Sequence, residues 1–115
     1  MICFPNAKIN LGLNVLSHRK DGYHNISSLL YPVPLYDVME FFPSDSLTLK
    51  LYGSDTGIPE KENLVTKAWA LMQRQYGIPP LRIKLLKNIP AGAGLGGGSA
   101  DAAFLLKAAN ECFDL

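Results

Sequence analysis

Polar and apolar residues alternate over positions 8–16, KINLGLNVL. The odd positions from Ile9 to Val15 are apolar, whereas Lys8 and the even positions up to Asn14 are polar or glycine. Successive side chains of a β-strand point to opposite faces of a sheet, so this pattern predicts a strand with one apolar face.

Other segments also have the pattern of strands. Residues 25–33 are extended by composition, with prolines at 32 and 34 that end the segment or place it on a sheet edge. Residues 37–42 and 47–52 are separated by Pro-Ser-Asp, which predicts a hairpin between them. Residues 81–87 again alternate, and they predict a half-buried strand.

Two segments have helical spacing. Apolar residues recur at helical intervals from Leu64 to Tyr76, with Asn63 as the expected N-cap and Gly77 as the expected stop. A second helix is predicted near residues 100–113, with Ser99 as its N-cap and Asp101 in its first turn. Antiparallel strands with two helices, without regular βαβ units, predict an α+β fold in two layers.

Composition and charge exclude several classes of function. The chain has 115 residues, 48% of them hydrophobic and 18% charged, which is typical of one soluble domain. A formal charge of +1 without a basic cluster gives no electrostatic reason to expect nucleic acid as a partner. No apolar stretch approaches the roughly 18 residues of a membrane span, and the N-terminus lacks the pattern of a signal peptide. We therefore expect a cytoplasmic protein without a membrane partner, with Cys3 and Cys112 as buried thiols rather than a disulfide.

The glycine segment, residues 90–100 with the sequence PAGAGLGGGSA, holds five of the ten glycines. It follows a predicted strand and leads into a predicted helix, where backbone N–H groups and the positive end of the helix dipole favour an anion. Its spacing satisfies G-x-G-x-x-G only weakly, because four residues separate the strand from the first glycine and the expected acidic residue is missing. The Walker pattern is absent, since no Gly-Lys-Ser/Thr follows. A different phosphate-binding loop is the working hypothesis, and a flexible linker is the alternative.

Three further features have both a structural and a functional interpretation. Ser99 either caps the helix or offers its hydroxyl to phosphate or magnesium. Lys8 and Asn10 share one strand face, where a lysine is either solvated or placed to act on a hydroxyl nucleophile and phosphate charge. Tyr23 and His24 either pack together or read a nucleobase, by stacking and by hydrogen bonding to its edge.

Taken in order, NAKINLGLNVL, DGYH and NIPAGAGLGGGSADAA resemble the GHMP kinase superfamily. The resemblance implies the fold of an N-terminal GHMP kinase half, like domain 2 of ribosomal protein S5, with a mixed sheet and helices packed on one face. AKINLxLxV followed by DGYH narrows the resemblance to the branch that phosphorylates the 2-hydroxyl of 4-diphosphocytidyl-2-C-methyl-D-erythritol in non-mevalonate isoprenoid biosynthesis. One minor departure is Asn6, where the family often has proline.

The resemblance also implies roles for individual residues. Lys8 would be the active-site lysine near the attacking hydroxyl, Asn10 would support the methylerythritol end, Tyr23 would stack on cytosine and His24 would bond its edge. ATP would bind with Mg²⁺, and no protein metal ligand is implied beyond Ser99 acting through magnesium-ATP. The phosphates would be held by the glycine segment, which consists of Pro90, Ala91, Gly92, Ala93, Gly94, Leu95, Gly96, Gly97, Gly98, Ser99 and Ala100.

The resemblance places the catalytic aspartate and a C-terminal domain after residue 115, and neither Asp101 nor Asp114 matches the aspartate's motif. We therefore expect residues 1–115 to be an incomplete ATP-binding N-terminal domain, inactive alone, with an exposed apolar face that favours self-association. Two alternatives stay open. One is a GHMP kinase for homoserine, mevalonate or a sugar, and the other is a non-catalytic nucleotide-binding module.

Overall fold

The computed structural model describes residues 1–18, 24–53 and 63–115, with side chains described outside 12–28. Short backbone segments with alternating burial form the strands, and the two segments with helical spacing form the helices. The elements in chain order are β1 (Ile2–Cys3), β2 (Asn6–His18), β3 (His24–Tyr36), β4 (Val38–Pro43), β5 (Thr48–Gly53), α1 (Leu64–Tyr76), β6 (Leu81–Lys87) and α2 (Gly97–Cys112).

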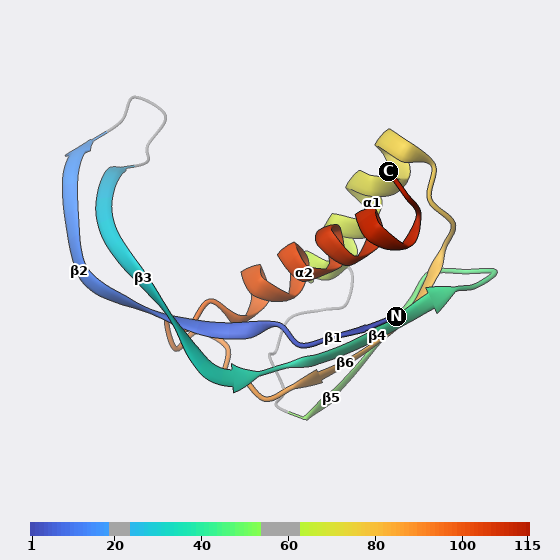
Figure 1. The fold of residues 1–115 in the computed structure, drawn as a ribbon, viewed down its shortest axis with the longest axis horizontal. Helices are drawn as coiled ribbons and strands as arrows, with labels where there is room; N and C mark the ends of the chain where they lie inside the picture. The colour runs from blue at the N-terminus through green and yellow to red at the C-terminus, as the bar shows by residue number, and fades with distance from the viewer. Residues whose placement is uncertain (19–23, 54–62) are drawn as a thin grey trace.

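Four strands form a mixed sheet in the order β1-β4-β6-β5, and both helices cover the same face of it (Figure 1). β4 is antiparallel to β6, whereas β5 is parallel to it. The core lies between the sheet and the helices, and its fully buried members include Phe41, Ile83 and Leu105. The predicted α+β class, with a mixed sheet and helices on one face, is confirmed.

The predicted hairpin between residues 37–42 and 47–52 is wrong. Both segments are strands, but β6 lies between β4 and β5 and pairs with each of them. The parallel β5–β6 pair is joined through α1, so the sheet contains one βαβ connection that the sequence analysis did not expect. The turn residues after β4 redirect the chain without pairing the strands on either side, because pairing depends on the distant strand β6.

The first helix begins and ends where its capping residues predict. The Asn63 side chain accepts a hydrogen bond from the N–H of Val65 at 2.9 Å, and Gly77 ends α1 in the left-handed conformation with φ of 65°. Val65 and two further residues on the same helix face are buried, and the Trp69 ring N–H donates to the carbonyl of Pro79. Other apolar residues of the predicted stripe, such as Leu71 and Tyr76, are exposed.

β2 and β3 form a separate two-stranded antiparallel ribbon that extends away from the main sheet (Figure 1). Both strands are longer than predicted, and Pro32 lies within β3, paired with Lys8, rather than at the end of a strand. A strand at the edge of a ribbon tolerates proline where its missing N–H would face away from the neighbouring strand.

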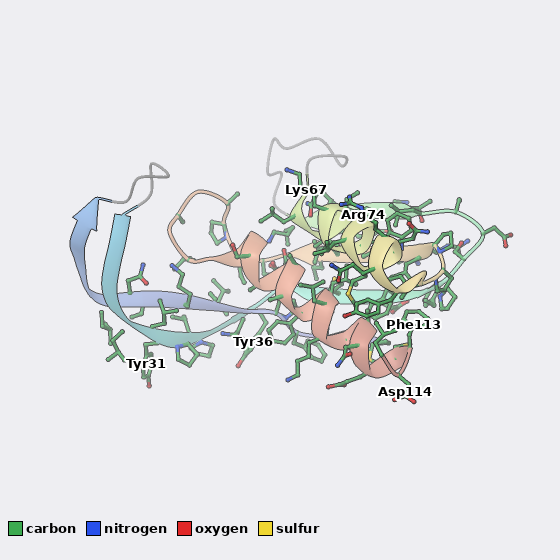
Figure 2. All side chains as sticks on the ribbon, turned by 90° about the horizontal axis from the view of Figure 1, so that it is seen from above. Tyr31, Tyr36, Lys67, Arg74, Phe113 and Asp114 are labelled. Carbon is green, nitrogen blue, oxygen red and sulfur yellow. The ribbon has the colours of Figure 1, made fainter. Side chains whose placement is uncertain are left out.

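Ile9 and Leu11 lie on one side of β2, as the predicted alternation requires, but this side is exposed; the register of β2 is irregular between Leu11 and Asn14, and the side chains of residues 12–16 lie outside those described. Ile9 lies opposite Tyr31, and Leu11 lies opposite Leu29. Their exposed fractions are 37% for Ile9, 44% for Leu11, 64% for Leu29 and 58% for Tyr31. We call these four residues the apolar ribbon face, and Figure 2 shows Tyr31 extending outward from β3.

Both cysteines are free, as predicted. Cys3 is half-buried, but Cys112 is exposed, so the prediction of two buried thiols is wrong for Cys112. Cys112 is the last residue of α2, where the helix faces solvent beyond the core. Neither described helix is long and apolar enough to cross a membrane.

Candidate functional site

The loop between β6 and α2, residues 88–96, combines several left-handed glycines with a helix start. Gly92, Gly94 and Gly96 have φ of 72°, 74° and 70°, a conformation that other L-residues rarely adopt. α2 then begins at Gly97, with Gly96 as its N-cap and no capping side chain within the described chain. The first N–H groups of a helix have no partner inside the helix, so this end presents donors to a ligand.

The prediction that Ser99 caps α2 is wrong. Ser99 is the third residue of the helix, and the left-handed Gly96 starts the helix three residues earlier than expected. The backbone N–H of Ala100 donates to the carbonyl of Gly96 as the first helical bond. Asp101 therefore lies in the second turn rather than in the first.

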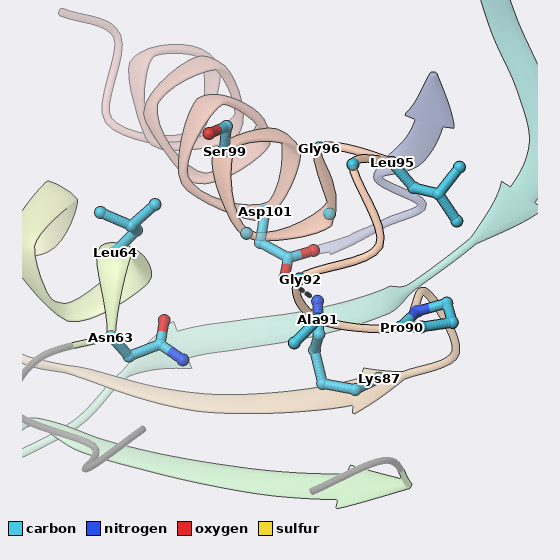
Figure 3. Close-up of a pocket in the computed structure, with 13 residues that line it drawn as sticks. Asn63, Leu64, Lys87, Pro90, Ala91, Gly92, Leu95, Gly96, Ser99 and Asp101 are labelled. Carbon is cyan, nitrogen blue, oxygen red and sulfur yellow. Dashed lines mark hydrogen bonds and ion pairs between the residues drawn. The ribbon is translucent and has the colours of Figure 1, made fainter. Parts of the chain in front are cut away.

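A cavity of about 240 Å³ lies beside this helix start (Figure 3). Nine of the eleven residues of the predicted glycine segment line it, and Ala93 and Ala100 do not. The lining residues are Asn63, Leu64, Lys87, Pro90, Ala91, Gly92, Gly94, Leu95, Gly96, Gly97, Gly98, Ser99 and Asp101. The four lining residues outside the segment were not predicted as part of a site.

The N-termini of both helices meet at this cavity. Asn63 and Leu64 come from the start of α1, and Gly97 and Gly98 come from the start of α2. A Cβ on Gly98 would lie 3.7 Å from the Leu64 side chain, so the two helix ends are neighbours. Two positive dipole ends at one cavity favour a negatively charged ligand more than a single end would.

Two glycines of this site allow other groups to approach closely. A Cβ on Gly96 would lie 2.7 Å from Cε of Lys8, and a Cβ on Gly97 would lie 2.8 Å from Cγ2 of Ile89. Real Cβ atoms do not come so near to another heavy atom, so a side chain at either position would force Lys8 or Ile89 to shift.

Lys8 lies against this loop, although an exposed lysine on an open strand would have been the simpler expectation. Its Nζ donates to the carbonyl of Gly94 at 2.9 Å, and its backbone N–H donates to the carbonyl of Leu95 at 2.9 Å. Asn10 lies two residues further along β2 and is exposed. The structure therefore brings Lys8 to the loop that lines the cavity, and its catalytic role stays a prediction.

The other two predicted substrate residues cannot be placed in the same way. Tyr23 lies outside the described residues. The backbone of His24 begins β3 opposite His18, but its side chain is not among those described. Their proposed roles stay predictions.

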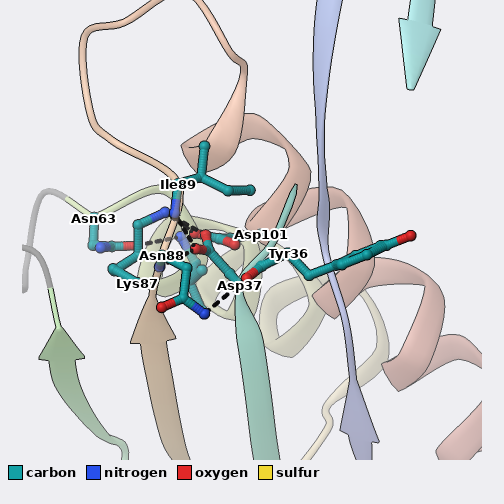
Figure 4. A network of polar contacts seen from close by, with 8 residues as sticks. Tyr36, Asp37, Asn63, Lys87, Asn88, Ile89 and Asp101 are labelled. Carbon is teal, nitrogen blue, oxygen red and sulfur yellow. Dashed lines mark hydrogen bonds and ion pairs between the residues drawn. The ribbon is translucent and has the colours of Figure 1, made fainter. Parts of the chain in front are cut away.

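A buried cluster of charged residues beneath the loop was not predicted (Figure 4). Nζ of Lys87 lies 2.5 Å from Oδ2 of Asp37 and 2.7 Å from Oδ2 of Asp101. All three side chains are at most 4% exposed. We call these three residues the charge cluster.

Asp37 and Asp101 differ in how well their oxygens are satisfied. Oδ1 of Asp37 accepts from the backbone N–H of Asn88 at 2.7 Å and of Ile89 at 2.9 Å. Oδ1 of Asp101 is buried and has no hydrogen-bond partner within the described chain.

The pKa values follow from these contacts. Burial raises the pKa of Asp101 to about 7, assisted by its hydrogen bond with Asp37 and only partly offset by Lys87. Burial acts in the same direction on Asp37, but hydrogen bonds from Asp101, Lys87 and two backbone N–H groups outweigh it and lower the pKa. Burial opposes the charge of Lys87, but its bonds to Asp101 and Asp37 outweigh it and raise the pKa.

The alternation of buried residues in the sequence indicates two members of this cluster, Lys87 and Asp101. Lys87 continues the buried alternation of Leu81, Ile83 and Leu85, and it therefore falls on the core face of β6. Asp101 lies one turn before the buried Leu105 on α2. A charged residue that continues an apolar face indicates a buried and paired charge, and this reading would have found both residues.

The described residues include no group of three or more His, Cys, Asp or Glu side chains arranged to hold a metal. Mg²⁺ bound with a nucleotide takes most of its ligands from phosphate and water, so such a group is not required. The glycine loop and the helix start fit the phosphates of a nucleotide, and Ser99 lines the same cavity.

Comparison with known proteins adds to this geometry. Residues 63–115 match the model of the GHMP kinases N terminal domain. A 4-diphosphocytidyl-2-C-methyl-D-erythritol kinase of Parabacteroides distasonis is 58% identical over 111 residues, which cover 96% of this chain and 41% of that protein. A relative with the same name from Bacteroides fragilis is 51% identical over 120 residues and is covered to 43%. The chain thus spans about two fifths of the length of these relatives.

Solved structures agree with the sequence matches. A crystal structure of 4-(cytidine 5'-diphospho)-2C-methyl-D-erythritol kinase superposes with a TM-score of 0.80 at 40% identity, covering 98% of this chain and 41% of that one. The sequence matches extend over both the ribbon and the glycine loop, and the fold agrees over nearly the whole chain. Residues 63–115 therefore match the GHMP kinases N terminal domain, and the chain is similar in sequence and fold to these kinases over nearly its whole length.

Proposed function

We propose that the protein is an ATP-dependent kinase that phosphorylates the 2-hydroxyl of 4-diphosphocytidyl-2-C-methyl-D-erythritol in isoprenoid biosynthesis. The observation that carries the proposal is the cavity at which two helix N-termini and the glycine loop come together, with the Lys8 side chain bonded to the same loop at Gly94. The names of the relatives and of the superposed crystal structure support the choice of substrate. In this proposal residues 1–115 are the ATP-binding domain, and the protein works in the cytoplasm.

ATP would bind with its phosphates against the N–H groups at the start of α2. Gly97, Gly98 and Ser99 supply the first N–H groups of this helix, and the left-handed glycines before them leave the loop without side chains that would block the approach. Mg²⁺, bound to the phosphates, would neutralise part of their charge, with the Ser99 hydroxyl as the nearest protein group proposed for it.

Lys8 would serve the chemical step. In the transfer, the substrate oxygen forms a bond to the γ-phosphorus, the bond from phosphorus to the β–γ bridging oxygen breaks so that ADP leaves, and the hydroxyl proton passes to the catalytic aspartate that the family resemblance implies. The Lys8 ammonium lies beside the loop, 2.9 Å from the Gly94 carbonyl, where it can stabilise negative charge on the attacking oxygen and the phosphoryl group. Asn10, two residues along the strand, would hold the methylerythritol end.

The cytidine end would be read on the ribbon. Tyr23 would stack on the cytosine ring, and His24 would hydrogen-bond its edge. β2 carries Lys8 at one position and pairs with the strand that begins at His24, so one ribbon would hold both ends of the substrate.

The test is a transfer assay with the full-length protein. ATP labelled at the γ-phosphate is offered with the cytidyl substrate, and in parallel with homoserine, mevalonate and galactose. We expect label in the cytidyl product alone. Transfer to another alcohol would reassign the substrate, and nucleotide binding without any transfer would indicate a non-catalytic nucleotide-binding module.

A further inference from the structure

The charge cluster joins the two ends of the β6–α2 loop. Lys87 is the last residue of β6, directly before the loop, and Asp101 lies on α2, five residues after the loop ends. The salt bridge of 2.7 Å between them therefore spans the base of the loop. Asp37, from the junction of β3 and β4, holds Lys87 from the other side at 2.5 Å.

The same cluster holds the backbone at the β6 end of the loop. Oδ1 of Asp37 accepts the N–H groups of Asn88 and Ile89, and the side-chain amide of Asn88 donates to the carbonyl of Tyr36 at 2.9 Å. The Ile89 side chain in turn packs beneath Gly97, at the α2 end. The positions of the two loop ends are thus linked through buried polar contacts as well as through packing.

Stability alone does not explain a buried cluster of this kind. Burying an ammonium with two carboxylates costs desolvation energy, and apolar side chains of the same size often give an equal or greater stability. Asp101 makes the cost larger, because its Oδ1 is buried without a partner in the described chain. What the cluster does supply is a fixed geometry at the base of the loop that lines the cavity.

We propose that Lys87, held between Asp37 and Asp101, is a positioning residue that fixes the two ends of the β6–α2 loop and thereby sets the affinity for nucleotide phosphates. The proposal rests on the proposed function, because it assumes that the cavity binds the phosphates of ATP. A loop whose N–H groups are held in place before binding loses less conformational entropy when the phosphates arrive. Lys87 and Asp101 also line the cavity, but their charged groups are buried and bonded within the cluster, so in this account the cluster acts through the loop.

Asp101→Ala tests the link at the α2 end. This substitution leaves the Lys87–Asp37 pair intact and removes the buried oxygen that has no partner within the described chain. Alanine also has a high helix propensity, so we expect the variant to fold. Loss of one charge-assisted contact should raise the dissociation constant of a non-hydrolysable ATP analogue about tenfold. Asp101→Asn keeps an oxygen that can accept from Lys87 and should restore affinity to within about threefold of the original.

Calorimetric titration of the full-length protein with the imido analogue of ATP and Mg²⁺ gives the affinities, and urea unfolding gives the stability of each variant. Glu111→Ala, at an exposed position on the same helix, is the matched control and should bind as the original does. In the transfer assay, KM for ATP should rise with Asp101→Ala, while kcat and KM for the alcohol stay nearly constant. If the cluster only stabilised the fold, Asp101→Ala would not raise KM for ATP selectively.

Asp37→Asn provides a second variant at the β6 end, and it should weaken nucleotide binding in the same direction. The proposal is overturned if folded Asp101→Ala and Asp37→Asn bind the analogue as tightly as the original protein. If the original protein itself fails to bind the analogue, the proposed function fails and this inference fails with it. The two failures are therefore distinguishable.

Discussion

Nζ of Lys8 donates a hydrogen bond to the carbonyl of Gly94, although the two residues are 86 positions apart in the chain. This contact joins the ribbon to the glycine loop, and a backbone bond from Lys8 to Leu95 runs beside it. The ribbon would carry the substrate and the loop would hold ATP in the proposed kinase. The Lys8–Gly94 contact therefore connects the proposed substrate-binding ribbon with the proposed ATP-binding loop.

Lys8→Met should abolish most of the activity while keeping the length of the side chain. Removing a charge that stabilises a transition state costs about 10²–10³-fold in kcat. Lys107→Met, at an exposed position on α2, should leave kcat unchanged. Steady-state transfer rates of the two variants decide the matter, and an unaltered kcat for Lys8→Met would remove Lys8 from the chemical step.

Gly96→Ala should disturb the same contact through shape alone. The new Cβ would lie 2.7 Å from Cε of Lys8, so the lysine side chain must shift, and we expect its bond to Gly94 to weaken. Alanine at a φ of 70° also costs about 1–2 kcal/mol of backbone strain.

The control separates the two effects. Gly92 has a similar φ of 72°, but a Cβ there meets nothing within 4 Å. Gly92→Ala should therefore lower the free energy of unfolding by a similar amount and keep more of the activity. Equal losses of kcat in both variants, each measured alongside urea unfolding, would contradict the role given to the Lys8 approach.

The sequence predicted those parts of the fold that local interactions decide. The predicted ends of α1, at Asn63 and Gly77, are correct, because a side-chain cap and a left-handed glycine act within a few residues. The pairing of β4 with β6 was missed, because strand partners are chosen by contacts between segments about 40 residues apart. The prediction of Ser99 as the N-cap was wrong, because the left-handed Gly96 begins the helix three residues before Ser99 without a capping side chain.

The site also has a part that the sequence predicts and a part that it does not. The glycine segment was recognisable because several neighbouring glycines need a backbone explanation. The charge cluster draws Asp37, Lys87 and Asp101 from three distant positions, and each is an ordinary charged residue when taken alone. Only their place on buried faces distinguishes them, and their mutual contacts depend on the assembled sheet and helix.

Self-association stays a prediction, and the structure supplies a surface on which to test it. The apolar ribbon face exposes four large side chains on one side of a two-stranded ribbon. Leu29→Ser combined with Tyr31→Ser should weaken association about tenfold or more, since burial contributes roughly 25 cal/mol per Å² of apolar surface. Tyr76→Ser, at an exposed position on α1, serves as control. Light scattering over a concentration series gives the result, and a protein that is monomeric throughout would disprove the prediction.

The stability of the fold should depend on pH through Asp101. Its pKa is about 7 in the folded protein against 3.8 for the free side chain, so the folded state binds the proton more tightly than the unfolded state. Such a group stabilises the fold fully below pH 3.8, and this contribution is lost as the pH rises through about 7. Asp37 acts in the opposite sense, because its lowered pKa makes its contribution disappear only in acid below pH 3.8.

Asp101→Asn removes this titration. We expect the free energy of unfolding of the original protein to fall between pH 5 and pH 8, and that of the variant to fall much less. At pH 8 the variant should be more stable by about 1–3 kcal/mol, because the charged carboxylate with its unpartnered oxygen is gone. Urea unfolding at the two pH values measures the difference, with exposed Glu111→Gln as the control. Parallel pH curves for Asp101→Asn and the original protein would show that Asp101 does not titrate in this range.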